Sequence, residues 1–175
     1  NGFAGGVRGG PQGLAQCGFP LCKGNIMASN PQWCLSLDEW KEQFSQWIRV
    51  PQPEALLNAT IFFDFRTLFG KAELAEAMRR HLLMQTSSNP MFLRCMAQNA
   101  LDVEPPLGKI RDFLTDLEPD HPGKIDLKKY GSRIFVDVAR IYALATGVHN
   151  TNSVQRLRLA SKRLSIRDEE INAVL

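Results

Sequence analysis

The sequence predicts an all-α fold, a bundle of six to seven helices behind an irregular N-terminal lead. Apolar residues recur at helical spacing in most segments of ten or more residues. Serine, proline and glycine stand between those segments, where helices begin and end. The sequence shows no internal repeat and no alternation of strands with helices. One short β-hairpin near residues 108–129 is the exception that the pattern allows.

Length and composition describe a globular chain. Its 175 residues, 44% hydrophobic and 22% charged, suffice for one domain with a core. No apolar run is long enough to cross a bilayer, and the N-terminus lacks a signal pattern, so we expect a soluble cytoplasmic protein without a membrane partner. The net charge of +3 falls short of the dense basic surface that nucleic-acid binding requires, which argues against a nucleic-acid partner.

Motifs that would give this chain catalysis of its own are missing. The cysteines have no zinc-ligand spacing, so we expect reduced, buried or half-buried thiols and no metal site. Glycine-rich phosphate loops and nucleophile motifs are absent. The pair of acidic residues on a strand that would hold magnesium for nucleotidyl transfer is also absent. We therefore expect no catalytic residue and no bound cofactor in this chain.

The N-terminal part is expected to be irregular until the first helix begins. Residues 1–30 are interpreted as a linker or the remnant of a preceding domain, and residues 31–175 as a helical domain. Ser36 and Glu39 form a capping box, and the apolar residues that follow lie on one helical face. The sequence VPQP, which begins at Val50, ends this helix because proline cannot continue it.

The next segment, residues 54–86, contains an ambiguous run, TIFFDFRTLFG. Its isoleucine and phenylalanine content suits a strand, while its length and flanks suit a buried helix, which we favour. On a helical wheel one apolar arc holds Ile61, Phe62, Phe65, Leu68 and Phe69. Gly70 would separate this helix from a second one, on whose apolar face we expect His81 to be a hydrogen-bonded core residue.

Three further helices and the start of a fourth complete the bundle. Pro90 begins a helix that runs to about Ala100, and the hairpin or a loosely structured excursion follows. The segment from about Ser132 to Ala145 is apolar nearly all round, which predicts a helix at the centre of the bundle. A helix over about 151–164 and the start of another after Ser165 follow, and we expect the last one to be truncated at the C-terminus.

Several charged residues stand in apolar surroundings. Asp64 and Arg66 lie in the phenylalanine-rich run, Lys128 follows an alternating stretch, and Arg140 interrupts the central helix beside Asp137. A buried ion needs a partner or a cavity, so either these residues form internal ion pairs, or they line a cleft that binds phosphate or carboxylate groups.

The helix over 151–164 carries cations without an intervening acid. Arg156, Arg158, Lys162 and Arg163 form a basic face, with an apolar side formed by neighbouring leucine and alanine residues. A solvated face is the simpler interpretation, and contact with a ligand phosphate or an acidic partner is the alternative.

Five strings, in one order, resemble a known family. They are CGFPLCKGNIMASNPQW, LLNATIFFDFR followed by Gly70, GKIDLKKYG, VDVARIYAL and TNSVQRL. This order resembles the putative nucleotidyltransferase substrate-binding domain, the C-terminal part of bacterial proteins similar to PII-uridylyltransferase. The resemblance covers the chain from about residue 14 to its end.

The resemblance implies a role and partners. An upstream nucleotidyltransferase domain would supply magnesium and a nucleoside triphosphate, and a PII-like protein would be the substrate in nucleotide-linked signalling. Cyclic-nucleotide-binding and CBS domains often precede the domain in such proteins. A non-catalytic interaction or dimerisation module that docks a regulatory domain is the alternative, and it predicts an exposed apolar patch. The hypothetical substrate-binding residues are Asn30, Asp64, Arg66, Lys128, Arg140 and Arg156.

Overall fold

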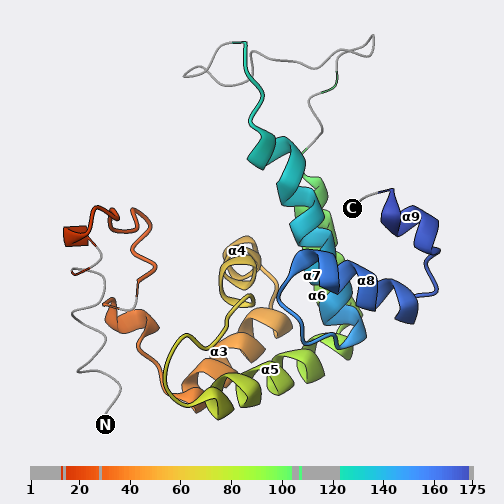
Figure 1. The fold of residues 1–175 in the computed structure, drawn as a ribbon. Coiled ribbons are helices and arrows are strands. Elements are labelled where there is room, and N and C mark those ends of the chain that lie inside the picture. The colour runs from red at the N-terminus through yellow and green to blue at the C-terminus, as the bar shows by residue number, and fades with distance from the viewer. Residues whose placement is uncertain (1–12, 14, 28, 104–106, 108–122, 174–175) are drawn as a thin grey trace. The chain divides into compact units, whose positions relative to one another are not determined.

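A computed structural model describes residues 13, 15–27, 29–103, 107 and 123–173. The elements in these ranges are helical, which confirms the predicted all-α class (Figure 1). They are the 3-10 helix η1 (Pro31–Trp33), α3 (Leu37–Arg49), α4 (Pro53–Phe62), α5 (Ala72–Ser87), α6 (Pro90–Leu101), the π-helical turn η2 (Lys128–Ser132), α7 (Arg133–Thr146), α8 (Ser153–Arg163) and α9 (Asp168–Asn172).

The chain divides into two compact units, residues 1–43 and 44–175, and the division falls inside α3. In the first unit the predicted capping box is confirmed. The Ser36 N–H donates to Glu39 Oε2 at 2.7 Å, and the Glu39 N–H donates to Ser36 Oγ at 3.3 Å. These reciprocal bonds satisfy backbone donors at the start of the helix. Hydrogen bonds from the side chain and the backbone N–H of Ser36 to the Glu39 carboxylate hold the pKa of Glu39 below its usual value.

The second unit is built around α7, which contacts α5, α6 and α8. Ala139 and Ala143 of α7 are buried, as is Ala160 of α8. Small side chains at such positions let two helices approach closely. At the end of α7, Gly147 takes a left-handed conformation with φ of 70°. The prediction that this segment lies at the centre of the bundle is confirmed.

An aromatic cluster forms another part of the core of the same unit. Phe63 lies 4.7 Å from Phe44 and 6.0 Å from Phe92 between ring centroids, and Trp47 packs on Phe44 at 5.5 Å. His81 is half-buried beside this region, and its Nε2 lies 2.8 Å from Ser45 Oγ. The expected hydrogen-bonded histidine is therefore confirmed.

The predicted helix is confirmed as far as Phe62 and is wrong for residues 63–69. The α4 helix ends at Phe62, and residues 63–71 form a loop, which we call the α4–α5 loop. Leu68 and Phe69 are 84% and 99% exposed and do not form a buried arc. Aromatic residues have modest helix propensity, so tertiary contacts decide the conformation. Here Phe63 packs into the aromatic cluster and only 1% of it stays exposed.

The prediction of a hairpin near residues 108–129 is wrong for residues 123–129, which form no strand. Residues 108–122 lie outside the described residues. Lys128 and Lys129 begin the helical stretch that leads into α7. Asp126 Oδ1 accepts the N–H groups of both lysines, at 2.9 and 3.0 Å. An aspartate that caps free N–H groups favours a helix start over the alternating pattern.

The cysteines are free thiols, of which Cys95 is half-buried. Cys17, Cys22 and Cys34 are exposed, so the expectation of buried or half-buried thiols is wrong for these three. Cys17 and Cys22 stand in or beside turns and Cys34 follows η1, and irregular segments of this kind generally run over the protein surface.

Candidate functional site

Asp64 is the centre of a charge cluster that joins the α4–α5 loop to α7 and α8. Arg140 of α7 donates from Nε and Nη2 to Asp64 Oδ2, at 3.0 and 2.8 Å. Arg156 of α8 places Nη2 2.6 Å from Asp64 Oδ1. Arg140 also donates from Nη1 to Asp137 Oδ1 at 2.5 Å. We call Asp64, Asp137, Arg140 and Arg156 the Asp64 network.

Local sequence positions each member of the network. Asp64 follows the end of α4 by two residues, and the buried Phe63 beside it fixes that point of the chain. Arg156 lies in the first turn of α8, which begins where Asn152 Oδ1 accepts the Gln155 N–H at 3.1 Å. Asp137 and Arg140, three residues apart, share one side of α7.

The network is largely withdrawn from water. The side chains of Arg140 and Arg156 are 7% and 3% exposed, while that of Asp64 is 25% exposed. Burial acts to raise the pKa of Asp64, but the ion pair with Arg156 and the charge of Arg140 hold this pKa below its usual value. The carboxylate is therefore ionised at neutral pH, as two buried guanidinium groups require.

A third buried arginine adjoins the network. Arg79 of α5 donates to the Phe65 carbonyl, and its guanidinium carbon lies 4.4 Å from the centre of the Phe65 ring. Burial lowers the pKa of Arg79, and the charge of Arg156 lowers it further. Arg156 Nη1 has no hydrogen-bond partner in the described part of the chain. Guanidinium groups thus outnumber carboxylates among the buried residues here.

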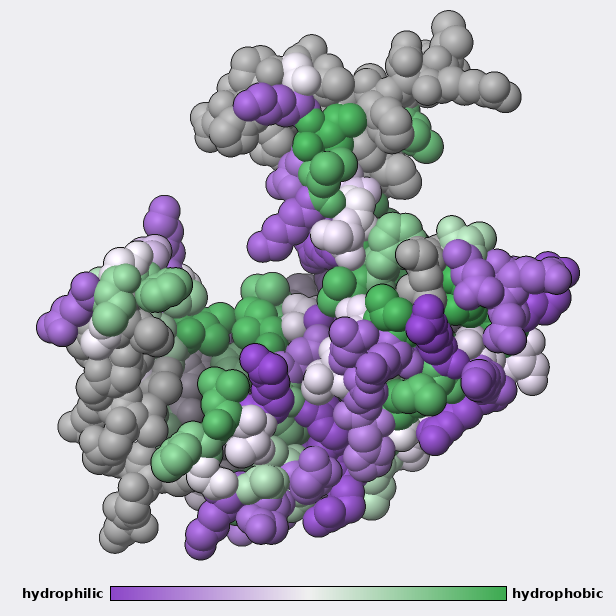
Figure 2. All heavy atoms as spheres, in the orientation of Figure 1, coloured by the Kyte–Doolittle hydropathy of each residue, from purple (hydrophilic) through white to green (hydrophobic). Residues whose placement is uncertain are grey.

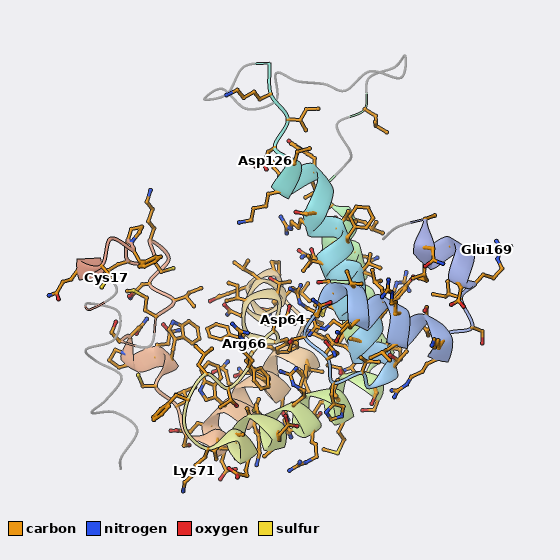
Figure 3. All side chains as sticks on the ribbon, viewed as in Figure 1. Cys17, Asp64, Arg66, Lys71, Asp126 and Glu169 are labelled. Atoms are coloured by element: carbon orange, nitrogen blue, oxygen red, sulfur yellow. The ribbon has the colours of Figure 1, made fainter. Side chains whose placement is uncertain are left out.

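The network fixes the base of the α4–α5 loop. Asp64 and the Phe65 carbonyl each accept from guanidinium groups on the helices, and Phe63 is buried. Beyond this base the loop is exposed from Arg66 to Lys71. Figure 3 labels Asp64 where the chain leaves α4 and Arg66 two residues further along the loop.

The other predicted site residues lie elsewhere. Arg66 is exposed in the loop, and Lys128 is exposed at the start of η2. Asn30 belongs to the first unit, where its Oδ1 accepts the Gln32 N–H at 3.0 Å and caps η1. The structure therefore brings together Asp64, Arg140 and Arg156 from the predicted set. A substrate-binding role for any of the six stays a prediction.

Sequence reasoning missed Arg79. It stands in the string AMRRHLL, where two adjacent arginines suggest a solvated face. The available signal was periodicity, because Arg79, Leu82, Leu83 and Thr86 share the buried face of α5 at helical spacing. In the ranges that the structure describes, no group of three metal-ligating side chains forms. No described helix is long and apolar enough to cross a membrane.

Comparison with known proteins gives two family matches. Residues 90–175 match the family described as the putative nucleotidyltransferase substrate binding domain, which confirms the resemblance seen in the sequence. Residues 8–54 match a family described as a putative nucleotidyltransferase. No curated protein and no solved structure matches the chain. Lys128, Arg140 and Arg156 lie in the first matched range, whereas Asp64 and Arg66 lie between the two. The predicted boundary at residues 30 and 31 stays a prediction.

Proposed function

Residues 90–175 belong to the putative nucleotidyltransferase substrate binding domain family, and from this premise we propose that the helical unit, residues 44–175, holds a protein substrate for a nucleotidyltransferase domain. The substrate class we favour is a PII-like protein, because the sequence resembles the uridylyltransferases that modify such proteins. Magnesium and the nucleoside triphosphate would be bound by the nucleotidyltransferase domain, since the transferred group needs metal-held phosphates.

The observation that carries this proposal is the anchored α4–α5 loop. Its tip exposes Leu68 and Phe69 almost completely, with Arg66 and Lys71 on either side. Large apolar side chains beside an arginine are typical of the residues that dominate protein–protein contacts. Because the Asp64 network and Phe63 fix the base of the loop, less conformational entropy is lost when a partner binds its tip.

Regulation by neighbouring domains is a further part of the proposal. Cyclic-nucleotide-binding or CBS domains, which often precede this domain in the proteins it resembles, would connect the transfer reaction to nucleotide levels. Its support is the sequence resemblance.

Calorimetric titration of the full chain with a purified PII-like protein tests the substrate. We expect Phe69→Ala to weaken binding about tenfold or more, as the loss of a contact residue in the centre of an interface does. Arg66→Ala should weaken it about threefold. Arg80→Ala is the matched control, because Arg80 is exposed on α5 outside the loop, and it should leave binding within about twofold. Equal affinity of Phe69→Ala and the parent chain would refute the loop as the substrate contact.

The exposed Leu68 and Phe69 also favour the second candidate, an interaction or dimerisation module. In that case the same variant has a different effect. Phe69→Ala would convert a self-associating chain into a monomer in sedimentation velocity. Neither the parent chain nor the variant would bind a PII-like protein. A chain that is monomeric with and without the substitution would exclude dimerisation through the loop.

A further inference from the structure

A hollow lies between α8 and α9, apart from the α4–α5 loop. Its volume is about 230 Å³, below the range of about 300–1,000 Å³ that is usual for drug-sized ligands. Its lining residues are Arg158, Ser161, Lys162, Asp168, Ile171 and Asn172. Hydrophilic residues gather over α8 and α9 (Figure 2). Its size suits a small polar ligand.

The wall that α8 contributes is cationic. Arg158 and Lys162 are one helical turn apart, so both side chains lie on the same face of α8. Both are exposed, and neither forms an ion pair with a residue that the structure describes. A guanidinium and an ammonium group on one face provide donors for a phosphate group.

The wall that α9 contributes can accept hydrogen bonds. Asp168 and Asn172 stand four residues apart, again on one helical face. The Asp168 carboxylate forms no ion pair with Arg158 or Lys162, although all three line the hollow. Carboxylates and amides that face a hollow can bind sugar hydroxyl groups, as an acidic residue does for ribose in dinucleotide-binding folds.

The buried residues beneath the hollow and the turn between α8 and α9 give the hollow a defined shape. Ser161 and Ile171 are buried beneath it, and Ser161 Oγ donates to the Arg158 carbonyl at 3.1 Å. In the connecting turn, Ser165 has a φ of 55°, and the Ile166 N–H donates to the Ser161 carbonyl at 3.0 Å. These contacts set the separation of the two walls.

We propose that this hollow binds a phosphorylated sugar, the ribose phosphate portion of a nucleotide. The phosphate lies against Arg158 and Lys162, and the sugar hydroxyl groups donate to Asp168 and Asn172. A free phosphate would be attracted by the two cations but repelled by the carboxylate of Asp168. The sugar is therefore needed for full affinity. The site is independent of the protein substrate proposed above, because it lies on other elements and its ligand is small.

Titration of the full chain with three probes tests this site. The probes are ribose 5-phosphate, ribose and inorganic phosphate, followed by calorimetry and by backbone amide shifts in NMR, for which 19.6 kDa is a suitable size. We expect ribose 5-phosphate to bind more tightly than either fragment. Its shifts should concentrate in α8 and α9.

Single substitutions test the contributions of the two walls to binding separately. Lys162→Ala and Arg158→Ala should each weaken ribose 5-phosphate binding about tenfold, the loss of one charge-assisted hydrogen bond. Asp168→Asn should weaken ribose 5-phosphate binding, yet it should strengthen inorganic phosphate binding because a like charge is removed. Arg80→Ala is the control and should change neither. These side chains are exposed, so the variants should fold, and circular dichroism checks this.

Two results would overturn the proposal. One is the absence of saturable binding of ribose 5-phosphate, or shifts that lie outside α8 and α9. The other is inorganic phosphate that binds as tightly as ribose 5-phosphate, with Asp168→Asn strengthening both, which would identify a plain anion patch. Binding of a PII-like protein without ribose phosphate binding would leave the proposed function standing and refute this site alone.

Discussion

The two sides of α8 carry charges in different environments. Arg156 is buried and paired with Asp64, whereas Arg158, two residues further on, is exposed at a hollow without an ion-pair partner in the described residues. The charge of Arg156 is balanced by Asp64, and this ion pair joins α8 to the α4–α5 loop. Arg158 keeps its charge available to a ligand. Helical position therefore decides whether a cation of this basic helix stabilises the fold or faces a partner.

Replacement of Asp64 should have the largest effect on the stability of the fold. Asp64→Ala leaves Arg156 without an ion-pair partner and Arg140 with Asp137 alone. Breaking a buried pair costs about 3–5 kcal/mol in the free energy of unfolding. Urea unfolding followed by circular dichroism measures the loss. Arg158→Ala is the matched variant on the outer side of α8, and it should stay within about 0.5 kcal/mol of the parent chain. Similar losses in both variants would contradict the distinction.

Acid should lower the free energy of unfolding through the same residue, Asp64, by a smaller amount. Arg156 and Arg140 hold the folded pKa of Asp64 below its unfolded value, although burial opposes them. A lowered carboxyl pKa contributes stability above the unfolded value of about 3.9, and this is lost as the pH falls through the folded pKa. Urea midpoints measured between about pH 5 and pH 3 should therefore fall more steeply for the parent chain than for Asp64→Asn. Parallel curves would mean that Asp64 contributes nothing to the acid dependence.

Most of the helical order could be predicted from the sequence, because local signals decide it. The capping box of Ser36 and Glu39, the proline at Pro90 and the apolar central segment each act within a few residues. The helices that they predict are present with nearly the expected bounds.

The α4–α5 loop could not be predicted, because contacts far apart in the sequence form it. A run of phenylalanines gives no local reason for the chain to leave the helix at Phe62. The reason lies in Phe92, Arg140 and Arg156, which come together with Phe63 and Asp64 only in the folded chain. For the same reason the sequence identified Asp64 and Arg140 as buried charges without showing that they pair.

A double-mutant cycle between Asp64 and Arg156 tests the central claim most directly. The free energy of unfolding is measured for the parent chain, Asp64→Asn, Arg156→Met and the double variant. A network that anchors the loop to α8 predicts a coupling energy of about 1.5 kcal/mol or more. Additive effects within about 0.5 kcal/mol would show that the two residues are independent, and the anchored loop would lose its physical basis.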